Sequence, residues 1–242
     1  MAWTPTAKSS ARESFTGFLD RTVEVAGSTR RFQVYVPFDW TKDKKWPVIL
    51  FLHGAGERGT DGLLQTQVGL GSAIRLNAAR WPFIVVMPQC DSGSWWTDPL
   101  PGALAMKALD DVMREFNGDE RRVYLTGISM GGYGTWRLAS EYPERFAAIA
   151  PVCGGVHAPF VTGKSERYAD VAAKVKGLPV WIFHGEVDPT IPVSESRQMF
   201  DALKSLGADV RYTEYKGIGH NSWDPAYAEP ELPKWLLSHS KK

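Results

Sequence analysis

Short runs of apolar residues recur along this 242-residue chain and alternate with longer amphipathic stretches. Most of these runs are almost continuously apolar, whereas a strand with one solvated face would alternate apolar and polar residues. Continuous runs are typical of strands buried on both faces, which occur in parallel sheets covered by helices. The runs span residues 47–52, 83–87, 122–126, 146–150, 179–183 and 210–215.

Two further strands are expected before these runs, at residues 15–25 and 31–37, with the turn Ala26-Gly27-Ser28-Thr29 between them. They predict an antiparallel hairpin. With amphipathic segments between the later strands, the pattern predicts an α/β fold: an eight-stranded, mostly parallel sheet with helices on both faces. The clearest helices are expected at 105–116, 194–206 and 226–238.

The length suits one domain of this class. We expect residues 1–14 to form an N-terminal extension and residues 15–242 a single catalytic domain. The segment 156–177 lies between two expected strands and is the only room for a cap. Such a cap would be small, so an active site on this fold should be open to solvent.

Composition excludes several kinds of partner. The net charge is +1, so no overall field favours nucleic acid or an anionic membrane. No run reaches the roughly 18 apolar residues of a membrane span, and Met1–Ser14 lacks the apolar core of a signal peptide. We expect a soluble protein that acts on a small molecule, cytoplasmic as given or secreted if a signal peptide was removed. Its oligomeric state does not follow from the sequence.

The two cysteines, Cys90 and Cys153, are too few for a disulfide framework, and they form no CxxC metal pair. Both lie among apolar strand residues, which predicts buried free thiols. A bridge between them is the open alternative.

The segment Gly127-Ile128-Ser129-Met130-Gly131 has the pattern G-x-S-x-G and directly follows an expected buried strand. In that context the serine lies on a sharp, strained turn between strand and helix, which exposes its hydroxyl above the sheet. A Cβ at Gly127 or Gly131 would clash with the neighbouring strand and helix. Ser129 is therefore the candidate nucleophile.

A serine hydroxyl needs a general base. His220 comes after the last strand and directly after two nearby glycines, in Gly217-Ile218-Gly219-His220, at the same rim as Ser129. The chain has four other histidines: His53 and His184 are expected to hold turns, His239 to be solvated, and His157 to have a structural or substrate-lining role on the cap.

The base in turn needs an acid that fixes its tautomer. Asp188 follows the penultimate strand in His184-Gly-Glu-Val-Asp188, and the order Ser, Asp, His along the chain is the one such folds use. Glu186, two residues earlier, is the rival.

An oxyanion needs two donors. The backbone N–H of Met130 supplies one, and the loop His53-Gly54-Ala55-Gly56 should supply the other. Ala55 is the first choice, and Gly56 is the alternative.

These residues together carry a family resemblance. The segments His53–Gly59, Gly127–Gly134 and His184–Asp188, with Gly219-His220, resemble those of bacterial carboxylesterases of the α/β-hydrolase superfamily. The nearest group spans phospholipase/carboxylesterases, feruloyl esterases and predicted peptidases, and the resemblance runs from Phe15 to the C-terminus. It implies ester hydrolysis through an acyl-enzyme, with no metal and no organic cofactor. The chain departs from lipases in its small cap and from prolyl oligopeptidases in lacking a propeller.

Candidate substrate residues lie on the rim loops. They are Gln89, Trp95, Trp96 and Trp223, of which the tryptophans could stack on sugars or aryl groups or pack the loops themselves. An open rim with tryptophans favours short acyl or aromatic, feruloyl-type esters on plant cell-wall carbohydrate.

Two other functions compete with this interpretation. A serine peptidase of the same fold would need extended substrate-binding loops, which the sequence does not indicate. A non-catalytic binding protein on a hydrolase scaffold would usually have lost a triad residue, and here all three are present in order.

Overall fold

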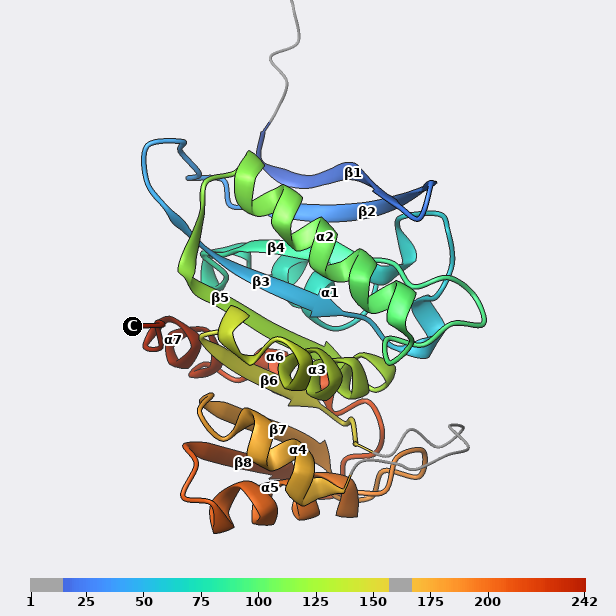
Figure 1. Ribbon diagram of the computed structural model, residues 1–242, viewed down its shortest axis with the longest axis vertical. Coiled ribbons are helices and arrows are strands. Elements are labelled where there is room, and N and C mark those ends of the chain that lie inside the picture. The colour runs from blue at the N-terminus through green and yellow to red at the C-terminus, as the bar shows by residue number, and fades with distance from the viewer. Residues whose placement is uncertain (1–14, 157–166) are drawn as a thin grey trace, which may run out of the picture.

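The computed structural model describes residues 15–156 and 167–242. Eight strands form one sheet in the order β1-β2-β4-β3-β5-β6-β7-β8 (Figure 1). The β1–β2 and β2–β4 pairs are antiparallel and all other pairs are parallel, as expected. The strands are β1 Gly17–Val25, β2 Ser28–Val36, β3 Trp46–Leu52, β4 Ile84–Pro88, β5 Gly118–Ile128, β6 Ala148–Val152, β7 Val180–Gly185 and β8 Val210–Tyr215.

Helices cover both faces of this sheet. The α-helices are α1 Leu70–Leu76, α2 Pro99–Glu115, α3 Met130–Glu141, α4 Tyr168–Val175, α5 Ser194–Ser205, α6 Trp223–Ala228 and α7 Leu232–Leu237. In Figure 1, α2, α3, α4 and α5 lie in front of the sheet, and α1, α6 and α7 lie behind it. Short 3₁₀ turns occur at Ala55–Glu57, Leu64–Thr66, Ala78–Arg80 and Pro143–Arg145.

The apolar runs fill two cores because successive side chains of a strand point to opposite faces. In β3, Val48, Leu50 and Leu52 pack with α2 and α3 on one face. Ile49 and Phe51 pack with α1, α6 and α7 on the other. Every residue of β3 is buried, which explains why its sequence shows no polar alternation.

The expected helix at 226–238 is wrong in one respect. The structure has two short helices there, α6 and α7, separated at Glu229-Pro230. Proline lacks an N–H and disfavours helical geometry in the residue before it, and Glu229 accordingly has an extended ψ of 116°.

The segment proposed as a small cap is described only in part. Residues 157–166, including His157, lie outside the described residues. The described remainder contains α4, which packs against α3 and α5 as a crossover helix. In the described chain, no helix has both the length and the apolarity needed to cross a membrane. Cys90 and Cys153 are buried free thiols, as expected.

Candidate active site

Ser129 lies on the turn between β5 and α3. Its backbone has φ 52° and ψ −116°, a strained conformation for a residue with a Cβ. The backbone N–H of Ser129 donates to the carbonyl oxygen of Val152 (3.0 Å), so β6 holds the turn from the other side. The hydroxyl is thereby placed at the carboxyl edge of the central strands.

Two glycines allow this turn to pack closely. A Cβ on Gly131 would lie 1.9 Å from the carbonyl oxygen of Leu52, and one on Gly127 would lie 2.3 Å from that of Gly131. The sequence-based explanation for both glycines is therefore confirmed. The same contact brings the end of β3, and the loop after it, against the start of α3.

The structure brings Ser129, His220 and Asp188 together. His220 Nε2 lies 2.9 Å from the Ser129 Oγ, and His220 Nδ1 lies 2.7 Å from the Asp188 Oδ2. Because an ionised carboxylate only accepts, Nδ1 carries the proton and Nε2 presents its lone pair to the serine hydroxyl. The His220 side chain is 21% exposed and that of Asp188 is fully buried.

Asp188 is surrounded by donors. Its Oδ1 accepts from the backbone N–H groups of Thr190 (2.8 Å) and Ile191 (2.9 Å), and its Oδ2 also contacts His184 Nε2 (3.2 Å). Burial alone would raise the pKa of Asp188. The hydrogen bonds from His184, His220 and the two amides outweigh it and hold this pKa well below its usual range. Asp188 is therefore ionised at neutral pH.

The rival acid, Glu186, points elsewhere. Its Oε2 accepts from the backbone N–H of Gly217 (2.8 Å) in the exposed loop that leads to His220. Glu186 thus supports the loop, and the geometry favours Asp188 as the partner of the imidazole.

His53 and His184 are fully buried and hold turns, as expected from the sequence. His53 Nδ1 donates to the carbonyl oxygen of Gly54 (2.6 Å), and its Nε2 accepts from the N–H of Cys90 (2.9 Å). Burial lowers the pKa of His53 to about 4. His184 Nδ1 accepts from the Ser196 hydroxyl (2.7 Å). The contact between His184 and Asp188 is not among the contacts expected from the sequence. The only indication in the sequence is that the two residues are four positions apart, at either end of one loop.

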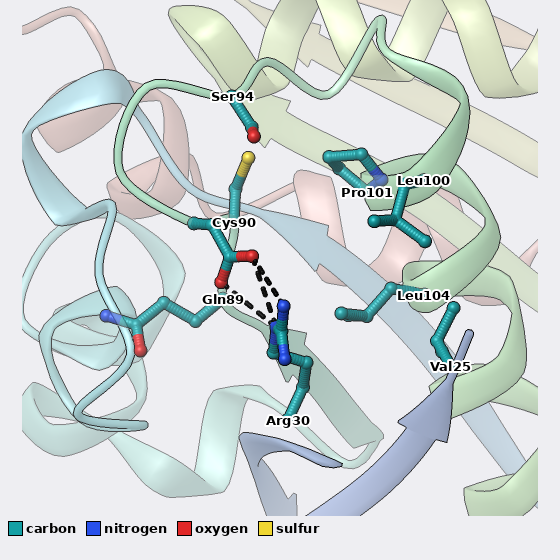
Figure 2. A pocket seen from close by; sticks show the side chains of 9 residues that line it. Val25, Arg30, Gln89, Cys90, Ser94, Leu100, Pro101 and Leu104 are labelled. Atoms are coloured by element: carbon teal, nitrogen blue, oxygen red, sulfur yellow. Dashed lines mark hydrogen bonds and ion pairs between the residues drawn. The ribbon is translucent and has the colours of Figure 1, made fainter. Parts of the chain in front are cut away.

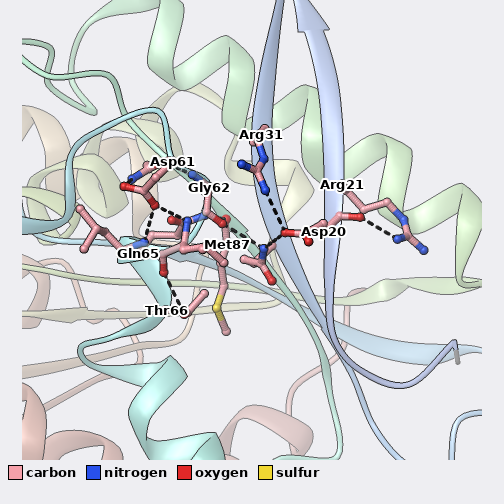
Figure 3. Close-up of polar contacts among 12 residues, drawn as sticks. Asp20, Arg21, Arg31, Asp61, Gly62, Gln65, Thr66 and Met87 are labelled. Atoms are coloured by element: carbon pink, nitrogen blue, oxygen red, sulfur yellow. Dashed lines mark hydrogen bonds and ion pairs between the residues drawn. The ribbon is translucent and has the colours of Figure 1, made fainter.

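The candidate oxyanion loop begins with the 3₁₀ turn Ala55–Glu57, directly after β3. Arg58 Nε donates to the carbonyl oxygen of Ala55 (3.0 Å), so Arg58 braces the loop. Hydrogen bonds also fix the segment 61–66. The Asp61 Oδ1 accepts from the N–H of Leu64 (2.8 Å) within it, and Gln65 Nε2 donates to Met87 O on β4 (3.3 Å) (Figure 3).

Gln89 and Trp96 require a correction, because their side chains are almost completely buried and contact protein. The Gln89 amide accepts from the N–H of Gly62 (2.7 Å) and donates to Glu57 O (3.1 Å). Trp96 Nε1 donates to His53 O (2.9 Å), and its ring packs edge-on against the His53 ring. Both residues therefore hold the candidate oxyanion loop in place through contacts within the protein.

The cavity beside Gln89 does not change this conclusion. Figure 2 shows the Gln89 side chain directed away from it, while Arg30 and Asp91 form an ion pair (3.0 Å) at its edge. Its volume is about 20 Å³, enough for roughly one water molecule.

Trp95 and Trp223 are only half-buried. The Trp95 ring packs edge-on against Tyr133, four residues after Ser129, with 6.2 Å between centroids. The Trp223 ring stands nearly perpendicular to the His220 ring, with 5.4 Å between centroids. These two tryptophans flank the candidate site, one beside the elbow and one beside the imidazole.

The only described group that could hold a metal ion consists of Cys153, Asp188 and His220, whose ligand atoms lie within 4.8 Å of one another. Burial raises the pKa of the Cys153 thiol to about 12, so it is protonated at neutral pH. The Asp188 Oδ2 and His220 Nδ1 already hydrogen-bond each other. A metal would have to break that contact, so this donor set fits a metal poorly.

The family model described as "Putative esterase" matches residues 24–225. The poly(3-hydroxyoctanoate) depolymerase of Pseudomonas fluorescens is 26% identical over 217 residues, which cover 80% of this chain and 74% of that protein. An uncharacterized secreted protein of Arthroderma benhamiae is 26% identical over 74% of this chain, but this chain spans only 22% of its length.

Solved structures show the same fold. A thermostable esterase has 36% sequence identity and a TM-score of 0.80, with 93% of this chain and 63% of that chain covered. A ferulic acid esterase from Anaeromyces mucronatus, solved with ferulic acid, has 16% identity and a TM-score of 0.65, with 91% and 90% covered.

Proposed function

The chain belongs to the esterase family and has the α/β-hydrolase fold, and from that premise we propose that it hydrolyses carboxylic esters through an acyl-enzyme. The observation that carries this proposal is the continuous contact of Ser129, His220 and Asp188 at one rim of the sheet. The residues come from three separate loops, and each atom faces the partner that its chemistry requires.

In the first step, the Ser129 Oγ attacks the ester carbonyl carbon while His220 Nε2 accepts the hydroxyl proton. Asp188 stabilises the imidazolium, since its carboxylate stays ionised and accepts from Nδ1. The backbone N–H groups of Met130 and Ala55 are the proposed donors to the oxyanion. The packing of Leu52 on Gly131 supports this pairing, because it places the two backbone segments against each other.

In the second step, His220 Nε2 returns its proton to the leaving alcohol oxygen as the C–O bond breaks, which leaves the acyl group on Ser129. A water molecule then attacks the acyl carbon while His220 Nε2 accepts its proton. His220 passes that proton to the Ser129 Oγ as the acyl C–O bond breaks, so the carboxylic acid leaves and the enzyme is restored. Water is the co-reactant, and no step requires an oxidant.

We propose short or aromatic, feruloyl-type acyl groups, carried on plant cell-wall carbohydrate, as the substrates. Trp95 beside the elbow supports an aromatic acyl group, since offset or edge-on ring contacts are favourable. Among structural neighbours of this fold, one is a feruloyl esterase module solved with sinapinate.

The test is hydrolysis of p-nitrophenyl esters from acetate to palmitate, and of p-nitrophenyl ferulate, by the wild type and by Ser129→Ala. We expect the variant to lose turnover by about 10⁶-fold, with an unchanged circular dichroism spectrum. Equal rates in both proteins would refute Ser129 as the nucleophile. A preference for palmitate would refute the proposed acyl groups, and cleavage of chromogenic amides would favour a peptidase.

A further inference from the structure

A groove of about 160 Å³ lies between α1 and α6, on the face of the sheet opposite α3. Its apolar wall includes Ala73, Leu76 and Trp223, together with the buried ring of Tyr227. The Tyr227 hydroxyl hydrogen-bonds the Thr126 hydroxyl (2.9 Å), which fixes that ring. The Leu76 side chain is 87% exposed, so the groove is open to solvent.

The groove adjoins the candidate active site at Trp223. Trp223 lines it and also packs edge-on against the His220 ring. Gly69, at its other wall, rests on the core: a Cβ there would lie 3.1 Å from the buried side chain of Phe51 and 3.3 Å from that of Ile128. Trp223 therefore forms a wall that the groove shares with the candidate active site.

We propose that this groove binds the alcohol portion of the ester, and that this alcohol is a single sugar ring. The inference rests on the function proposed above. His220 must protonate the leaving oxygen, so that oxygen lies within hydrogen-bond reach of Nε2. Whatever the oxygen carries then lies on the His220 side of the site, where Trp223 and the groove come next.

The lining favours a sugar over an aliphatic alcohol. A pyranose has apolar C–H faces and a hydroxyl-bearing edge, and here an indole and a leucine are accompanied by Arg80, Asn77, Ser72 and Asp224. The Arg80 guanidinium is held at the groove by a hydrogen bond from Nη2 to Glu229 O (2.8 Å). The volume is below the roughly 300 Å³ at which pockets for drug-sized ligands begin, which suits one ring.

The experiment compares two esters that share one acyl group: ethyl acetate and an O-acetylated methyl xyloside, with acetate release as the readout. Ala228 is exposed and lines the groove, so Ala228→Phe fills it without disturbing the core. The matched control is Ala79→Phe, at an exposed alanine of a separate surface groove. If Ala228→Phe impairs folding, Ala228→Leu places a smaller side chain in the same groove.

We expect the wild type to prefer the xyloside ester. Ala228→Phe should lower kcat/KM for that ester at least tenfold and leave ethyl acetate unchanged, whereas Ala79→Phe should change neither. Equal loss on both esters, or no wild-type preference, overturns the assignment of the groove. With either of those outcomes, the proposed function still stands if the wild type cleaves p-nitrophenyl acetate and Ser129→Ala does not. Absence of any ester cleavage overturns both.

Discussion

His53 should make the stability of this protein depend on pH in a way that one substitution removes. Its pKa is lowered by burial from 6.5 to about 4. In the neutral form Nε2 accepts from the N–H of Cys90, and protonation would place two N–H donors against each other. The unfolded chain takes up this proton near pH 6.5 and the folded chain only near pH 4. Stability is therefore complete above pH 6.5, falls as the pH falls toward 4, and loses no more below that value.

Because one pKa unit corresponds to about 1.4 kcal/mol, lowering the pH from 7 to 5 should cost about 2 kcal/mol of unfolding free energy through this residue. His53→Gln retains an acceptor that can reach Cys90 N and cannot titrate. Urea unfolding followed by tryptophan fluorescence at both pH values measures the difference. The wild type should lose about 2 kcal/mol more than the variant between pH 7 and pH 5. The same loss in both proteins would refute the reasoning.

Three further predictions, each tested by substitution, concern the site and the core. Asp188→Asn should lower kcat for p-nitrophenyl acetate by about 10⁴-fold, whereas Glu186→Gln should leave it nearly unchanged; the reverse result would make Glu186 the acid. Gly131→Ala forces Leu52 away from α3 and should cost at least about 2 kcal/mol of stability, measured by urea unfolding. Gly177→Ala, with no atom near the new methyl, is its control, and equal stability of the two would contradict the packing argument. Leu50→Ala removes a fully buried side chain and should cost about 2–5 kcal/mol in the same assay, so a loss below 1 kcal/mol would show that the core collapses around it.

Much of the fold follows from local pattern. All eight strands overlap the predicted segments, and β8 has the predicted bounds, 210–215. For β3, burial on both faces can be predicted from the sequence, because no polar residue interrupts the run Val48–Leu52. The division of the last helix at Pro230 was predictable from that proline and was missed because the amphipathic pattern continues across it.

Part of the candidate site could be predicted from the sequence in the same way. Ser129, Asp188 and His220 each follow a strand, and parallel strands end at one edge, so their meeting follows from topology. The direction in which the side chains at this rim point does not follow from topology. Trp96 is buried because its indole reaches the carbonyl of His53, 43 residues away, and no local pattern encodes that contact.

The contact between Ser129 and His220 joins residues 91 positions apart. During synthesis, β5 and the elbow leave the ribosome well before β8 and the loop that carries His220. Until β8 and that loop have emerged and docked, Ser129 has no imidazole beside it. A hydrolase activity that depends on Ser129 and His220 would therefore report on folding of the domain from β5 through His220.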